Sequence, residues 1–436
     1  MRSKLYLVLV FHILLLLFQL SFRQLIVDTT FVRDFGLFLM CFIFFGGQRE
    51  RIKEKDTLTT LVKIYLLYGI IMSLFHIVDG EGVLNTIVEY RNHFFPFILF
   101  FIAVYLLRDV KYRKKWVDFL FVVFIILLVD VYVEALMDMA GISRGVLPWY
   151  QYQFTHYYRF TDTDAGAKIV VNPEKSPILG LLGWNNPTSC AITALFSFFL
   201  PFLLRPGIKK SAEMPKVACL SSFSKVLLFI LTIGALAILT IKTPFVALAF
   251  VFLLYLMKGG KNKNAKTIVA VTVITVIVAY LTFPLWGETF FELFEETQGE
   301  QGMSYIFDQT VIATLLSVAF SGSPLAFLFG TDITGNSMYT LLEVRLIVHT
   351  IQFGVIWLII YGLISVYSIK TYNIINRCNR ATFDQMAATG AFLLVVSYLV
   401  DFLHYAHVMF LFHYDIYVVS IALLVAIKQK GIIHES

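Results

Sequence analysis

Charged residues are scarce in this sequence. They make up 15% of the 436 residues, against about a quarter in soluble domains. Hydrophobic residues reach 58%, and stretches such as residues 5–20, 58–78 and 226–241 approach or exceed the roughly 17–25 apolar residues that a membrane-crossing helix needs. Segments of about ten residues with alternating polarity, typical of an outer-membrane barrel, are absent. The sequence therefore excludes a water-soluble fold and predicts an all-α, polytopic membrane protein.

Cysteine is scarce as well. The four cysteines, Cys41, Cys190, Cys219 and Cys378, lie far apart, which fits neither a disulfide framework nor a zinc site. A glycine-rich loop followed by Lys and Ser or Thr, which would hold nucleotide phosphates, is missing. We therefore expect no metal and no cofactor, and an ATP-driven pump within this chain is disfavoured.

The apolar segments and the positive charges together predict a topology. Apolar segments long enough to cross a membrane predict about 12 transmembrane helices. The predicted segments are 5–22, 29–46, 58–78, 93–107, 117–139, 178–204, 225–241, 243–257, 267–286, 344–368, 386–404 and 408–427. Most of the 35 Lys and Arg residues fall in the loops on one side. Because cytoplasmic loops carry the excess of positive charge, both termini are expected in the cytoplasm. The net charge of +6 then reflects orientation, and it does not indicate nucleic acid.

Residues 1–436 thus form a single transmembrane domain with two long outer loops, 140–177 and 287–342. Acidic residues are interleaved with phenylalanines over 288–296, a pattern that suits the membrane interface. Residues 304–319 repeat apolar positions at helical spacing. We expect an amphipathic, interfacial or lid helix in this second loop, and chemistry on the outer side.

Lys242 is a candidate functional residue because of its depth. Residues 226–257 must cross the membrane twice, and half of that length as a helix reaches only about 24 Å, short of a core of about 30 Å. The turn that carries Lys242 is therefore expected below the outer surface, where a cation is costly unless it meets an anion. The alternative is a lysine that extends from a short hairpin to the interface.

The outer end of the tenth segment is unusually polar. Glu343, Arg345, His349 and Gln352 are spaced to share about one half of a helix. A carboxylate, a guanidinium and an imidazole in one place offer a base, an anion clamp and a proton relay. The structural alternative is an interfacial ion pair beside a core histidine.

Four features follow one another in a recognisable order. They are an Asn-Pro turn at 183–191, a short hairpin with a basic residue at 240–248, Pro-Leu and Phe-Gly pairs at 323–330, and the polar Glu343 ahead of Gly354. This order resembles the O-antigen polymerase and O-antigen ligase superfamily of membrane glycosyltransferases, over about residues 85–370. Lys242 replaces the usual Arg, which gives up bidentate phosphate binding. Glu343 stands where ligases carry His, which favours a polymerase, and residues 304–310 lack an expected Arg.

The resemblance implies a reaction in the bacterial cytoplasmic (inner) membrane. A hydroxyl of one polyprenyl-diphosphate-linked repeat unit attacks the anomeric carbon of another glycan, and lipid diphosphate leaves, without a metal. Glu343 and His349 are the candidate catalytic residues, and Lys242, Arg345 and Arg91 are the candidate diphosphate ligands. The candidate sugar-binding residues are Arg159, Tyr157 and Asn185. Expected partners are the lipid-linked oligosaccharide, membrane lipid, a chain-length regulator and a flippase.

Several of these residues could instead have a purely structural role. Arg91 could be an interface anchor, and the aromatic first outer loop could be a membrane-interface belt. Two other functions also stay open: an O-antigen ligase, and a lipid-linked oligosaccharide flippase or transporter. The transporter hypothesis uses Asp130, Glu134 and Asp138, which recur every four residues and so share one helical face.

Overall fold

The computed structural model describes most of the chain. The described residues are 1–25, 30–47, 56–80, 82–148, 178, 180–182, 185–204, 214–239, 243–258, 324–330, 345–377, 382–404 and 411–433. Within these residues every regular element is a helix, and no strand occurs. The prediction of an all-α fold is therefore confirmed for the described part.

Most of the helices follow the predicted apolar segments. The α-helices are α1 (Arg2–Leu17), α2 (Gln19–Leu25), α3 (Thr30–Gly47), α4 (Thr57–Val78), α5 (Val83–His93), α6 (Ile98–Leu107), α7 (Val110–Met139), α9 (Asn185–Leu204), α10 (Ser222–Ile238), α11 (Thr243–Lys258), α15 (Pro324–Phe329), α16 (Arg345–Arg377), α17 (Thr382–His404) and α18 (Leu411–Ile433). Three short 3₁₀ turns, η1 (Phe95–Phe97), η2 (Arg144–Val146) and η5 (Lys216–Cys219), lie between them.

Six of the described helices are long and apolar enough to cross a membrane. They are α4, α7, α9, α16, α17 and α18, and the bent pair of α5 and α6 would make a seventh. This supports a membrane-embedded protein. The predicted segment 267–286 and the predicted amphipathic helix over 304–319 lie outside the described residues, as do residues 149–177 of the first loop. The count of twelve spans and the outer loops stay predictions.

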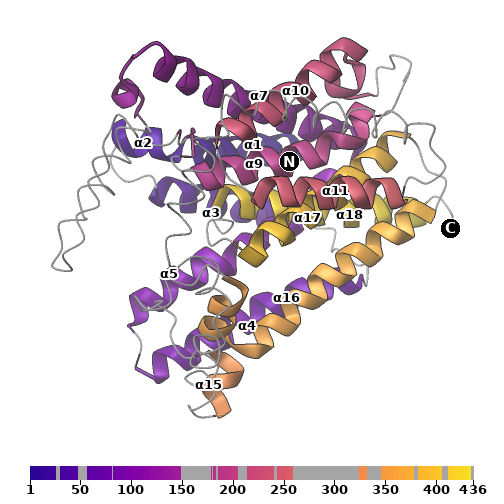
Figure 1. Ribbon diagram of the computed structural model, residues 1–436. Coiled ribbons are helices and arrows are strands. Elements are labelled where there is room, and N and C mark those ends of the chain that lie inside the picture. Colours follow the sequence, from indigo (N-terminus) through magenta and orange to yellow (C-terminus); the bar gives the residue numbers. More distant parts are fainter. Residues whose placement is uncertain are drawn as a thin grey trace.

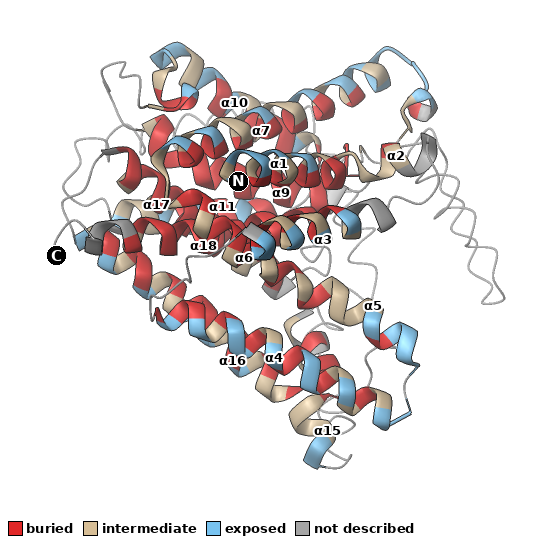
Figure 2. Cartoon of the chain, turned by 180° about the vertical axis from the view of Figure 1, so that it is seen from behind, coloured by how far each residue is buried: buried red, intermediate tan, exposed pale blue. Residues whose placement is uncertain are grey.

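Two helices form the centre of the bundle. The membrane-crossing stretches of α9 and α18 are each 94% buried, because apolar residues predominate on all of their faces and neighbouring helices cover them. α17 packs against both, and α6 packs against α18. In Figure 1, α4, α15 and part of α16 project below this bundle and α5 links them to it, while Figure 2 shows that their outer faces are the more exposed ones.

Ion pairs hold together helix ends that the charge pattern places on one side. Lys428 near the end of α18 lies 2.5 Å from the carboxylate of Asp56, which caps the start of α4. Arg113 in α7 lies 3.1 Å from Asp384 in α17, and both side chains are almost fully buried. This grouping fits the predicted alternation of the helices. The assignment of that side to the cytoplasm stays a prediction.

Candidate functional site

A proline interrupts the helix that α5 begins. Pro96 has no backbone N–H to donate, and the N–H of Phe97 donates to the carbonyl of Phe94 over 3.0 Å. In a regular helix that N–H would bind the carbonyl of His93, so this carbonyl loses its helical partner. The axes of the two halves meet at an angle of 41°. We call this interruption, residues 93–97, the α5–α6 break.

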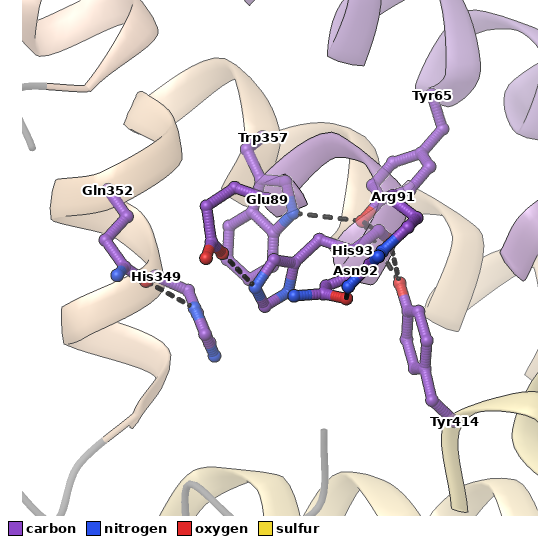
Figure 3. A network of polar contacts seen from close by, with 9 residues as sticks. All are labelled: Tyr65, Glu89, Arg91, Asn92, His93, His349, Gln352, Trp357 and Tyr414. Atoms are coloured by element: carbon purple, nitrogen blue, oxygen red, sulfur yellow. Dashed lines mark hydrogen bonds and ion pairs between the residues drawn. The ribbon is translucent and has the colours of Figure 1, made fainter. Parts of the chain in front are cut away.

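Three surrounding helices supply hydrogen-bonding side chains to the break. The hydroxyl of Tyr414 (α18) donates to the His93 carbonyl over 2.7 Å, and that of Tyr65 (α4) reaches the same oxygen at 3.4 Å. The indole N–H of Trp357 (α16) donates to the Tyr65 hydroxyl over 3.1 Å. Because an unsatisfied buried carbonyl is costly, these contacts stabilise the break and fix α4, α16 and α18 around it (Figure 3).

The last turn of α5 carries a carboxylate–imidazole pair. The Nε2 atom of His93 lies 3.0 Å from a carboxylate oxygen of Glu89, one turn earlier. The exposed fraction of the side chain is 24% for Glu89 and only 11% for His93. The carboxylate therefore reaches the accessible edge of the break, while the imidazole lies inside it.

Arg91, between these two residues, points toward a different helix. Its guanidinium pairs with the carboxylate of Asp34 in α3 at 3.1 Å and donates to the side-chain oxygen of Asn92 at 3.4 Å. The Nε atom of Arg91 is buried and makes no hydrogen bond within the described part of the chain. Arg91 thus joins α5 to α3, and only part of its hydrogen-bonding capacity is used for that.

His349 faces the break from the first turns of α16. Its Nδ1 atom lies 2.9 Å from the side-chain oxygen of Gln352. Because an amide oxygen only accepts, Nδ1 carries the hydrogen, and Nε2 carries the lone pair of the neutral ring. The ring stacks on Phe353 and Phe402, at interplanar angles of 8° and 3°, and its centroid lies 5.2 Å from that of His93. His349 is therefore held in one plane with Nδ1 as the donor, so that Nε2 is the proton acceptor whenever the ring is neutral.

Two glycines place the start of α16 against α15. Gly354 has φ 78° and ψ 170° and divides α16 into two helical parts, and Gly330 has φ 93°. A β-carbon on Gly354 would overlap the carbonyl of Leu328, and one on Gly330 would overlap the carbonyl of Gln352. The backbones of 328–330 and 352–354 therefore approach as closely as they do because both glycines lack a side chain.

The structure describes only some of the predicted site residues. The side chains of Lys242, Glu343, Arg345, Arg159, Tyr157 and Asn185 lie outside the described part, although Arg345 and Asn185 begin α16 and α9. Arg91 and His349 are described. The ring of His349 lies against that of His93 at the α5–α6 break, as Figure 3 shows, whereas Arg91 pairs with Asp34 in α3.

Two residues at the break, Glu89 and His93, were not among the predicted site residues. Their signal was present in the sequence as a four-residue spacing immediately before Pro96, since residues four apart share a helix face. Tyr65 and Tyr414 gave no such signal. They reach the site from helices that are remote in the sequence.

The three acidic residues that share one face of α7 have different surroundings in the structure. Asp138 pairs with Arg144 at 3.2 Å, whereas Asp130 and Glu134 are buried one turn apart. On α18, His413 hydrogen-bonds to the backbone carbonyl of Pro187 at 2.7 Å, so it ties α18 to the start of α9. No group of three or more potential metal ligands occurs within the described ranges.

Comparisons with protein-family models, with curated proteins and with solved structures found no match for this chain. The resemblance to the polymerase and ligase superfamily therefore stays a prediction from ordered motifs. Of these motifs, the structure describes residues 185–191, 243–248 and 324–330 and the glycine at 354. Motifs that are separate in the sequence lie in backbone contact at Gly330 and Gly354.

Proposed function

We propose that this chain is a membrane glycosyltransferase that polymerises polyprenyl-diphosphate-linked oligosaccharide repeat units. The product would be an O-antigen or capsular polysaccharide, made at the outer face of the bacterial cytoplasmic membrane. One observation supports this proposal most strongly: the Gly330 and Gly354 motifs are in backbone contact, and the ring of His349, which precedes Gly354 on α16, lies 5.2 Å from that of His93 at the α5–α6 break. Motifs whose order resembles a glycosyltransferase family thus lie beside a cluster of polar side chains.

The reaction needs cations on one side and a base on the other. The bond from the anomeric carbon to the diphosphate oxygen breaks, its electron pair leaves with the diphosphate, and the acceptor oxygen bonds to the carbon. Lys242, Arg345 and Arg91 are assigned to the developing charge on the diphosphate. Arg91 already pairs with Asp34, but a guanidinium has five N–H donors, so it can hold Asp34 and an anion together. Glu343 takes the hydroxyl proton, with His349 as its partner.

The finer topology belongs to the same proposal. Twelve spans with both termini in the cytoplasm would place loops 140–177 and 287–342 on the outer side, with an amphipathic helix over the site. Arg159 and Tyr157 in the first loop, and Asn185 at the start of α9, would then contact sugar. The ion pairs of Lys428 and Arg113 at the opposite helix ends support this arrangement.

The test uses the purified chain in lipid nanodiscs with a polyprenyl-diphosphate-linked repeat unit. The wild type should produce a ladder of products, whereas Lys242→Ala, Arg345→Ala and Glu343→Ala should leave single repeat units. Lys63→Ala is the matched control, because Lys63 is an exposed lysine within α4. A normal ladder from all three site variants would refute the proposal.

Deletion in the native host separates the other functions. Loss of a polymerase leaves single repeat units on the outer face. Loss of a ligase leaves long polymer on the polyprenyl carrier, and loss of a flippase leaves repeat units on the cytoplasmic face. Either of the last two results would replace the polymerase with that function.

A further inference from the structure

Glu89 and His93 lie one helical turn apart, and a pair at this spacing stabilises an isolated helix by only about 0.2–0.5 kcal/mol. A buried polar side chain is costly unless it is hydrogen-bonded. Here the pair lies in the last turn before the α5–α6 break, with the imidazole inside and the carboxylate at the accessible edge. The His93 carbonyl is already satisfied by Tyr414, so the backbone does not need the side-chain pair. The Glu89 carboxylate therefore orients the His93 ring, while Tyr414 holds the backbone.

His349 is the group next to this pair. Phe353 and Phe402 stack on its ring, and the His93 ring contacts it at an interplanar angle of 62°. Phe353 belongs to the same helix as His349, and Phe402 comes from α17. His93, from α5, is thus a polar ring that packs against His349 from a different helix. The hydrogen bond to Glu89 sets the orientation of the His93 ring.

A continuous chain of contacts runs from the bundle to His349. Tyr414 fixes the backbone of His93 over 2.7 Å, Glu89 fixes the His93 ring over 3.0 Å, and this ring packs against His349. An imidazole that accepts a proton in a reaction must keep its ring plane and tautomer. The plane depends on these ring contacts, and the tautomer depends on Gln352.

We propose that Glu89 and His93 are positioning residues that act through His349. The inference rests on the glycosyl transfer proposed above, in which His349 assists the base. Neither residue needs to touch the substrate. The carboxylate of Glu89 accepts the Nε2–H of His93, and the fixed His93 ring keeps His349 aligned for proton transfer. Because the diphosphate is assigned to other residues, the pair governs the rate of the chemical step and leaves substrate binding unchanged.

The experiment measures initial rates of polymer formation in nanodiscs at varied concentrations of the lipid-linked repeat unit. Glu89→Leu removes the hydrogen-bond acceptor and should lower kcat at least tenfold with KM within twofold. Glu89→Gln keeps an acceptor oxygen for His93 and should recover most of kcat. His93→Phe keeps a ring but loses the bond to Glu89, so it should resemble Glu89→Leu. Asn85→Leu, an exposed substitution one turn earlier on α5, is the matched control and should leave kcat unchanged.

A double variant tests whether the pair acts through His349. In a His349→Gln background, adding Glu89→Leu should change the residual rate less than twofold. Full additivity of the two losses, an effect on KM alone, or an unchanged kcat for Glu89→Leu would overturn the inference while the polymerase activity stands. Absence of a ladder from the wild type would instead refute the proposed function, and the inference with it.

Discussion

Gly354 lies at the bend of α16 and has a backbone conformation that other residues rarely adopt. With φ at 78° and ψ at 170°, it occupies a region that is essentially restricted to glycine. A β-carbon there would also overlap the carbonyl of Leu328. Gly354→Ala should therefore separate the start of α16 from α15, and we predict a large loss of stability.

The magnitude follows from two contributions. Forcing alanine into this backbone region costs about 1–3 kcal/mol. Moving α15 away from α16 also disrupts the hydroxyl of Tyr68, whose single hydrogen is shared between the carbonyls of Leu328 and Phe353, and one hydrogen bond contributes about 0.5–1.5 kcal/mol. Together these give a loss of about 1.5–4.5 kcal/mol in the free energy of unfolding.

The assay is equilibrium unfolding of the detergent-solubilised protein by titration with sodium dodecyl sulfate, followed by circular dichroism. Gly362→Ala is the control, because Gly362 lies in the same helix and a β-carbon there would meet no atom within 4 Å. Alanine in a regular helical position should stabilise the protein by about 0.5–1 kcal/mol relative to glycine. If Gly354→Ala unfolds at the same point as Gly362→Ala, the tight contact between α15 and α16 is wrong.

A buried hydrogen bond, a buried ion pair and the proposed chemistry give further expected outcomes. Asp415→Ala removes the carboxylate that lies 2.6 Å from the buried imidazole of His12. Leaving that ring nitrogen unsatisfied should cost about 1–3 kcal/mol in the same titration, and an unchanged free energy of unfolding would contradict this. Asp384→Ala should cost about 3–5 kcal/mol because it leaves Arg113 buried, whereas a double change of Asp384 and Arg113 to leucine should be much better tolerated. Finally, EDTA should leave the polymer ladder unchanged, and loss of the ladder on chelation, restored by added divalent metal, would show that the metal-independent mechanism is wrong.

The helices could be predicted from the sequence, because the membrane imposes a simple rule of length and apolarity. The segment 58–78 became α4 almost to the residue. The same rule placed a span at 93–107, but the structure begins a helix at Val83 and bends it at Pro96. Residues 83–93 include enough polar side chains to hide this half of the helix from a hydropathy search, although Pro96 marked the position of the bend.

The site was predictable only where its residues are neighbours in sequence. Gln352 was placed on one helix face with His349 by spacing alone, and the two side chains are 2.9 Å apart. Phe402 and Tyr414 belong to other helices and reach the site through the packing of α17 and α18. Spacing cannot predict such contacts, because they depend on how whole helices are oriented in the bundle.

The position of the site follows from how a membrane protein accommodates irregular backbone. Every backbone polar group must be satisfied within the bilayer, so non-helical segments are tolerated only where protein or a water-filled cavity surrounds them. Two helices here are interrupted, at Pro96 and at Gly354, and residues next to the two interruptions meet through His93, Phe353 and His349. Concentrating both interruptions in one place lets one set of donors, Tyr65, Tyr68 and Tyr414, satisfy the freed carbonyls. The same concentration provides a polar neighbourhood among the helices, which is what a charged diphosphate and a sugar hydroxyl would require.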